Sequence, residues 1–151
     1  MQYEKTRGVR ALDRVKITAG AFIFFASWES DLSPSTCRAF KSKLPFSGKL
    51  IHARWSGEAC WIPLGALNLG LVPENATSRL KPGQILFYSA NISETEILIP
   101  YGETRFCSSA GELAGNRLLT ITEGLDELAR LGKSTLWNGS CEILFEAAKS
   151  S

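Results

Sequence analysis

The sequence is poor in the residues that most often bind metal ions and phosphate groups. It contains a single histidine, His52, and its four cysteines are widely spaced, with no Cys-x-x-Cys pair. A structural zinc site needs about four cysteine or histidine ligands at short spacings. Gly111 and Gly115 lack the spacing of a nucleotide-phosphate loop. We therefore expect neither a bound metal nor an organic cofactor.

Long apolar runs and an excess of one charge are also missing. The apolar stretch at 19–28 has about half of the ~20 residues that a membrane-spanning helix needs. The net charge of +2, from 17 basic and 15 acidic side chains, provides no broad basic field for nucleic acid. Residues 1–16 are charged throughout, so they cannot form the apolar centre of a secretory signal. We expect a cytoplasmic protein that binds neither membranes nor nucleic acids.

The periodicity of apolar residues predicts one domain of mainly β structure over residues 14–148, preceded by a charged leader at 1–13. A chain of this length can bury a core without a disulfide or a metal. Ser33 and Pro34 are typical of the first residues of a helix, with the serine as its N-cap. Strands are predicted at 14–18, 21–28, 48–62 (as a hairpin), 84–88, 94–100, 117–122 and 142–147, and helices from Pro34 to the residues before Pro45 and over 125–136.

Two segments between these elements have less regular patterns. Residues 63–83 are rich in glycine and proline, and a connection of that length in a small domain is often a functional flap. Residues 106–116 are typical of a loop with a short helical turn. The sum of seven or eight strands and two helices favours a closed β-barrel with helices at its ends.

The hairpin at 48–62 carries the chemically most distinctive residues. Taking Ser56 and Gly57 as a two-residue turn, we predict that His52 lies directly opposite Trp61. Residues that are directly paired share a face of the sheet. One face then holds apolar side chains, and the other face holds the set His52, Arg54, Ala59 and Trp61.

Several strings in the chain resemble cyclophilin-like sequences. Residues 33–40 (SPSTCRAF) resemble the start of the first helix in cyclophilins. The strings HARWSGE at 52–58, SETEILIPYG at 93–102 and GELAGN at 111–116 are similar to those of a prokaryotic family of cyclophilin-like proteins with no established function. The resemblance covers nearly the whole chain beyond residue 14. It implies a cyclophilin-like closed β-barrel of about eight strands capped by two helices.

The resemblance does not extend to the catalytic groove of cyclophilins. In those proteins an apolar residue follows the catalytic arginine, and a Gln-Gly-Gly segment and further histidine and aromatic residues complete the groove. Here Arg54 is followed by Trp55 and Ser56, and the chain has no second histidine. A residual peptidyl-prolyl isomerase is therefore the least favoured function. Other cyclophilin-like proteins bind or act on small amides and carboxylates, so the resemblance leaves the chemistry open.

We hypothesise a site centred on His52, Arg54 and Trp61. His52 would be a neutral base near pH 7, since a neighbouring cation disfavours the protonated imidazole. Arg54 offers a bidentate fork for a carboxylate, and Trp61 offers a flat wall for a ring. The alternative is that His52 and Arg54 are polar residues of an outer face, with Arg54 stacked on Trp61.

Three further side chains complete this hypothesis. Glu58 and Glu96 could orient His52 or Arg54, or act as a general acid or base themselves. Tyr101 could donate a hydrogen bond at the rim of the pocket, whereas we expect Glu94 to be only solvated. The remaining tryptophans, Trp28, Trp55 and Trp137, are expected in the core.

Three classes of function remain open. The first is a small-molecule-binding protein for an anionic or amide compound, and as an enzyme it would be a cofactor-free isomerase, lyase or hydrolase. The second is a non-catalytic assembly module or homo-oligomer, anchored by Trp61 and an exposed Leu98. The third is the residual prolyl isomerase. A concave pocket favours the first class, and a flat apolar patch favours the second.

Overall fold

The structure is a computed structural model that describes residues 13–89 and 93–148. The predicted leader at 1–13 lies outside this part except for its last residue. The strands are β1 (Arg14–Ala19), β2 (Phe22–Trp28), β3 (Phe46–His52), β4 (Gly57–Gly65), β5 (Arg79–Leu80), β6 (Gln84–Tyr88), β7 (Thr95–Arg105), β8 (Cys107–Ser108), β9 (Gly111–Glu112), β10 (Asn116–Glu123) and β11 (Cys141–Ala148). The helices are α2 (Pro34–Lys41), the 3-10 turn η1 (Leu125–Glu127) and α3 (Leu128–Asn138).

Eight of these strands close into an antiparallel barrel. They follow one another in the order β4-β3-β11-β1-β2-β10-β6-β7, and β7 pairs with β4 to complete the ring. The short β5 extends the far end of β7, and β8 pairs only with β9. The predicted closed barrel of about eight strands with two helices is confirmed. Neither helix of the described part has the length and hydropathy needed to cross a membrane.

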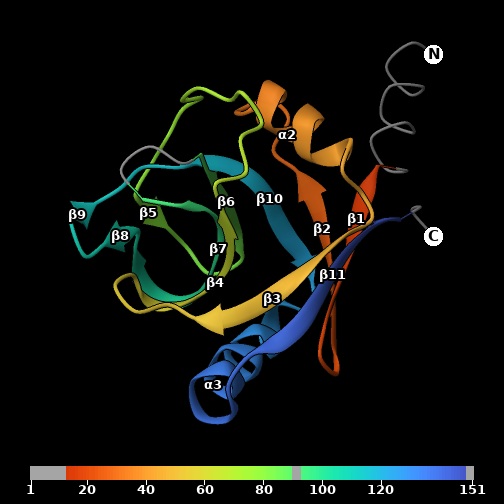
Figure 1. Cartoon of the computed structure of the whole chain (residues 1–151). Coiled ribbons are helices and arrows are strands. Elements are labelled where there is room, and N and C mark those ends of the chain that lie inside the picture. The colour runs from red at the N-terminus through yellow and green to blue at the C-terminus, as the bar shows by residue number, and fades with distance from the viewer. Residues whose placement is uncertain (1–12, 90–92, 149–151) are drawn as a thin grey trace.

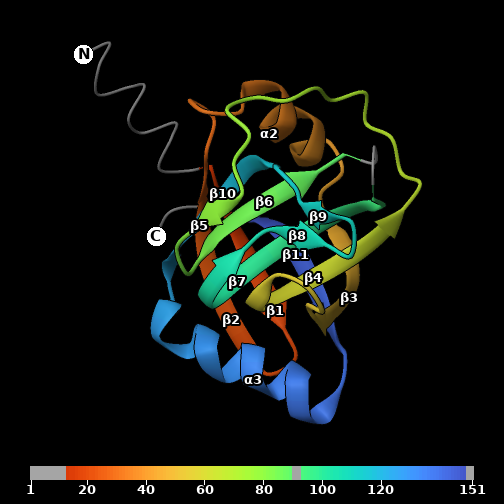
Figure 2. The ribbon, with the colours of Figure 1, turned by 90° about the vertical axis from the view of Figure 1, so that its left-hand side faces the viewer.

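The two helices lie at opposite ends of the barrel (Figures 1 and 2). Helix α2 directs Cys37 and Phe40 into the core, as its helical spacing predicts. Helix α3 directs Leu128 and Leu131 into the core from the other end. The last turn of α3 is different, because Trp137 is 81% exposed. The prediction that Trp137 belongs to the core is therefore wrong.

The first turn of α2 is capped by a residue from a distant segment. Ser33 occupies the N-cap position and Pro34 begins the helix, as predicted, but the Ser33 side chain makes no capping hydrogen bond. The Glu74 carboxylate instead accepts hydrogen bonds from the backbone N–H groups of Ser35 (3.0 Å) and Thr36 (2.9 Å). A negative charge is favourable at this end of a helix. This contact, together with the Asn116 side chain on the Glu74 N–H (2.8 Å), fastens the 63–83 connection to the barrel.

A second apolar cluster covers the outer face of the barrel where β4, β7 and β6 meet. It contains Leu98, which is 1% exposed, together with Phe106 and Leu113 from the segment that follows β7. That segment forms the β8–β9 hairpin, where the sequence predicted a helical turn. Leu98 is therefore not an exposed anchor for a partner chain, contrary to the prediction. The second cluster thus covers the outer face of β4 and β7. The site described next lies at the uncovered edge of this cluster.

Candidate functional site

The connection between β3 and β4 is longer than the predicted two-residue turn. Ile51 pairs with Trp61 and His52 pairs with Cys60, which shifts the predicted register by one residue. Gly57 adopts a φ of 93°, and a bulge in the β4–β7 pairing follows it. Because side chains alternate along a strand, a shift of one residue exchanges the faces. His52 therefore shares a face with Cys60, in the core of the barrel, and not with Trp61.

His52 and Tyr101 form a hydrogen-bonded pair on this inner face. The His52 Nδ1 lies 2.9 Å from the carbonyl oxygen of Ala53, and Nε2 lies 2.8 Å from the Tyr101 hydroxyl. A carbonyl oxygen only accepts, so Nδ1–H donates to Ala53, and in the neutral ring Nε2 accepts from Tyr101. Burial, with smaller effects from Cys60 and Glu58, raises the pKa of Tyr101 above its usual value and keeps this donor protonated. Both ring nitrogens are thus occupied.

Helix α3 holds the Tyr101 ring in place. A Cβ atom on Gly132 would lie 2.1 Å from a ring carbon of Tyr101, so only glycine permits this approach. Thr135, one turn further along, hydrogen-bonds the thiol of Cys60 at 3.3 Å. Burial raises the pKa of that thiol to about 11, which makes Cys60 a poor nucleophile. These contacts describe a packed structural cluster.

Glu58 is also outside the predicted site. Its carboxylate accepts a hydrogen bond from the Glu103 backbone N–H at 2.8 Å, and the Glu58 carbonyl accepts one from the Thr104 hydroxyl at 2.8 Å. These bonds tie the start of β4 to β7 at the bulge. The structure gives Glu58 a role in the hairpin, and Glu58 is not among the residues that line the pocket described below.

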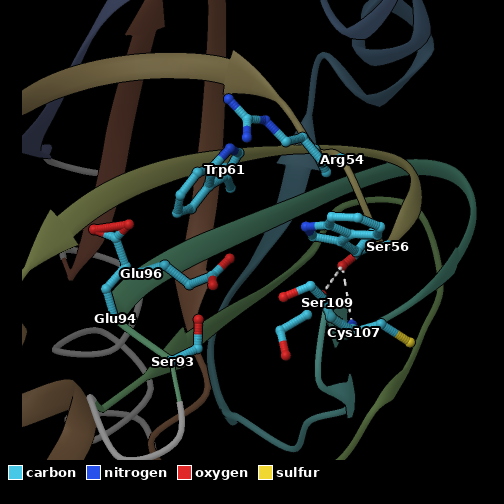
Figure 3. Close-up of a pocket in the computed structure, with 11 residues that line it drawn as sticks. Arg54, Ser56, Trp61, Ser93, Glu94, Glu96, Cys107 and Ser109 are labelled. Carbon is cyan, nitrogen blue, oxygen red and sulfur yellow. Dashed lines mark hydrogen bonds between the residues drawn. The ribbon is translucent and has the colours of Figure 1, made fainter.

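A pocket of about 290 Å³ lies on the outer face, at the open margin of the second cluster. It is lined by the connection after β3, by β4, by the start of β7 and by the segment around β8 (Figure 3). The lining side chains that carry polar or aromatic groups include Arg54, Trp55, Trp61, Glu94, Glu96 and Cys107. This volume is close to the lower end of the range for small-molecule sites.

Ser56 fixes the wall of the pocket opposite the glutamates. Its hydroxyl accepts a hydrogen bond from the Cys107 N–H at 3.0 Å and lies 3.2 Å from the Cys107 carbonyl, to which it donates. The Ser56 carbonyl accepts from the Arg105 N–H at 3.0 Å. Ser56 is 4% exposed and its hydroxyl is fully engaged. It therefore anchors the β8 segment to the β3–β4 connection, as Figure 3 shows.

Glu96 is the most perturbed ionisable group of the pocket. It is 7% exposed, and within the described residues its carboxyl accepts no hydrogen bond and forms no ion pair. Burial, with a smaller contribution from the Glu94 charge, raises the pKa of Glu96 to about 8. Burial disfavours the charged form of a carboxyl, and a second negative charge nearby adds to that effect. Glu96 can therefore gain or lose a proton near neutral pH.

Arg54 and two tryptophans form the rest of the pocket wall. Arg54 is exposed and forms no ion pair with any residue of the described ranges. Trp61 is partly buried against the second cluster, and its Nε1–H has no acceptor there. In the view of Figure 3, Arg54 and the two glutamates lie on either side of the Trp61 indole. Trp55, predicted for the core, is 58% exposed and lines the pocket.

The structure therefore divides the predicted site between the two faces. Arg54, Trp61 and Glu96 meet at the pocket, whereas His52 and Tyr101 meet on the inner face. Glu94, expected to be only solvated, joins the pocket and accepts a hydrogen bond from Gly65 N–H at 3.2 Å. The sequence signal that could have placed Glu94 in the site is its spacing of two residues from Glu96, because residues two apart on an extended strand share a face.

This arrangement supports binding and proton transfer. An unpaired guanidinium suits a carboxylate or an amide oxygen, and the indoles suit an apolar group. A carboxyl with a pKa near 8 is suited to general acid or base chemistry at neutral pH. Across the described ranges, no group of three or more histidine, cysteine, aspartate and glutamate side chains is placed to hold a metal ion.

The fold and the pocket define a closed antiparallel β-barrel protein with a cavity of small-molecule size on its outer face. More specifically, the chain belongs to the family described as "Protein of unknown function (DUF3830)", whose family model matches residues 15–147. No curated protein shows significant similarity to the sequence.

Two of the solved structures that match illustrate the shared fold. The structure of McbB in complex with tryptophan superposes with a TM-score of 0.70 at 15% identity, over 87% of this chain and 44% of the McbB chain. The chain thus spans less than half the length of McbB. The solution structure of the hypothetical protein AF2241 from Archaeoglobus fulgidus has a TM-score of 0.61 at 15% identity, over 91% of this chain and 96% of that chain. At this identity the likeness is one of fold alone.

Proposed function

We propose that the outer-face pocket binds a small molecule with a carboxylate or amide group, and that Glu96 transfers a proton to or from it. The observation that carries this proposal is Glu96, a residue that is 7% exposed, has no hydrogen bond or ion pair from its carboxyl in the described residues, and lines a cavity that Arg54 also lines. Trp61 lines the same cavity, and its Nε1–H is buried without an acceptor in the described residues, which is rare for a buried polar group. A bound ligand would supply the missing partner.

In this proposal each residue has a separate task. Arg54 holds the carboxylate or amide oxygen of the ligand, and the indoles of Trp55 and Trp61 flank its apolar part. Glu96 in its protonated form donates a proton to a carbonyl or a leaving group, and in its ionised form accepts one from the ligand. We include a cofactor-free isomerase, lyase or hydrolase in the proposal, in a cyclophilin-like barrel of cytoplasmic location. The tryptophan bound to the structural neighbour McbB supports a small-molecule role for this fold.

Binding is tested with a simple carboxylate of the right size. We expect 3-phenylpropionate to shift the amide NMR signals of the pocket residues in the ¹⁵N-labelled protein. Arg54→Gln should weaken this binding about tenfold or more, because a charge-assisted hydrogen bond is lost. The control Arg38→Gln changes an exposed arginine on α2 and should leave the binding unchanged. Shifts that avoid the pocket, or that survive Arg54→Gln, would overturn the binding proposal.

Proton transfer needs an experiment of its own. A mixture of small carboxylates and amides is incubated with the protein in D₂O, without added metal or cofactor, and deuterium incorporation is measured by mass spectrometry. We expect one class of compound to gain deuterium with the wild type and not with Glu96→Gln. Glu103→Gln, an exposed change on the same strand, serves as the control. Incorporation that persists in Glu96→Gln would remove Glu96 from the chemistry.

A further inference from the structure

The pocket holds two carboxyl groups and one guanidinium that do not neutralise one another. Glu94 and Glu96 both line it, and Arg54 forms an ion pair with neither, since no such contact exists within 4.0 Å in the described residues. Glu94 accepts a single hydrogen bond, from Gly65 N–H, and Glu96 accepts none from the described part of the chain. An ionised carboxylate has about four acceptor positions. The acidic side of the pocket therefore has unused acceptors, one set of them on a buried group.

A ligand with a negative charge alone would satisfy only Arg54. It would leave Glu96 without a donor and would place a further negative charge near Glu94. A ligand with a positive charge alone would leave Arg54 unused. The pocket is lined by opposite charges on different elements, Arg54 after β3 and the glutamates at the start of β7 (Figure 3). This separation matches a molecule that carries both charges.

We propose that Glu94 and Glu96 bind the ammonium group of the ligand while Arg54 holds its carboxylate, so that the pocket takes small aminocarboxylates with an apolar side chain. The inference rests on the proposed function, because it concerns the same pocket. Trp61 and Trp55 supply the apolar walls for the side chain. The cavity of about 290 Å³ has room for about ten water molecules, which suits a ligand of the size of one amino acid.

Binding of the ammonium group is coupled to a proton. Burial and the Glu94 charge raise the pKa of Glu96 to about 8, so Glu96 is mostly protonated at pH 7 in the free protein. A bound cation favours the ionised carboxylate. Glu96 then releases its proton to the buffer while the ligand keeps its ammonium charge. At pH 9 Glu96 is already ionised, and the same ligand binds without this release.

Three probes with one skeleton separate the two charges. Phenylalanine carries both groups, 3-phenylpropionate only the carboxylate and 2-phenylethylamine only the ammonium. NMR titration at pH 7 should show that phenylalanine binds at least tenfold more tightly than either analogue. Calorimetry at pH 7 in phosphate and in Tris should show the release of close to one proton by the wild type and of none by Glu96→Gln. Both Glu94→Gln and Glu96→Gln should abolish the tenfold preference, and Glu103→Gln should not.

The outcomes distinguish this inference from the proposed function. If 3-phenylpropionate binds at the pocket and phenylalanine binds no more tightly, the ammonium site is wrong and the proposed function stands. If neither carboxylate shifts the pocket signals, the proposed function fails first. If 2-phenylethylamine binds alone, and Glu96→Gln removes that binding, the ammonium site is supported and the role of Arg54 is wrong. Proton release that persists in Glu96→Gln overturns the coupling to Glu96.

Discussion

The two faces of the sheet formed by β3, β4 and β7 differ in whether their ionisable side chains have hydrogen-bond partners. On the inner face both nitrogens of His52 and the hydroxyl of Tyr101 have hydrogen-bond partners. On the outer face the Glu96 carboxyl and the Arg54 guanidinium have none in the described residues. Partnered buried groups stabilise a fold, whereas an unpartnered one destabilises it. The difference assigns the inner pair to structure and makes the outer pocket the candidate for function.

The largest expected effect is the change with pH in the free energy of unfolding that the buried Glu96 causes. Burial raises the pKa of Glu96 from 4.5 to about 8 in the folded protein. Between these values the folded state retains a proton that the unfolded state has lost, so stability falls as the pH rises. The stabilising contribution is complete below about pH 4.5 and is lost as the pH passes through 8. The total change is on the order of 5 kcal/mol.

A glutamine at position 96 cannot ionise, so Glu96→Gln should remove this decrease of the unfolding free energy with rising pH. Urea unfolding at several pH values between 5 and 9 measures it, with Glu103→Gln as the exposed control on the same strand. We expect the free energy of unfolding of the wild type to fall across this range relative to that of Glu96→Gln. Parallel pH profiles for the two proteins would mean that Glu96 is not held in an unfavourable site. They would contradict the proposed difference between the two faces.

The sequence predicted the fold better than the site because the two depend on different kinds of information. The strands at 14–18 and 84–88 and the helix from Pro34 follow from local periodicity and helix-start signals, and the structure confirms them. A single two-residue turn was assumed between β3 and β4, and the longer connection moved His52 to the other face. Face assignments are sensitive to one residue of register, while strand positions are not.

The burial of Glu96 and the cap from Glu74 could not be read from local patterns. Glu96 is buried on the outer face of β7, where its cross-strand partner Tyr88 belongs to the second cluster. Glu74 caps α2 from about 40 residues away in the chain. Both facts depend on the packing of segments that are distant in sequence. The glutamate pair at Glu94 and Glu96 was visible in the sequence, but its charge state was not.

A smaller effect is expected on the inner face, at the contact of α3 with Tyr101. In a helix Gly→Ala normally stabilises by about 1 kcal/mol. Gly132→Ala should instead destabilise the protein by about 1–3 kcal/mol, because the new Cβ would overlap the Tyr101 ring. Lys133→Ala, an exposed change on the same helix, is the matched control. Chemical denaturation measures both, and a Gly132→Ala protein more stable than the wild type would contradict the packed arrangement.

The smallest expected effect tests the assignment of His52 most directly. Tyr101→Phe and His52→Ala each remove one partner of the 2.8 Å hydrogen bond and should lower the free energy of unfolding by about 1 kcal/mol. In the double variant the two losses should not add, because the second change removes nothing that remains. Binding of 3-phenylpropionate should be unaffected, since neither side chain lines the pocket. The hypothesis from the sequence, in which His52 moves the proton, predicts the reverse: normal unfolding and lost turnover. Because the two hypotheses predict different free energies of unfolding for these variants, this measurement decides whether the inner face is structural.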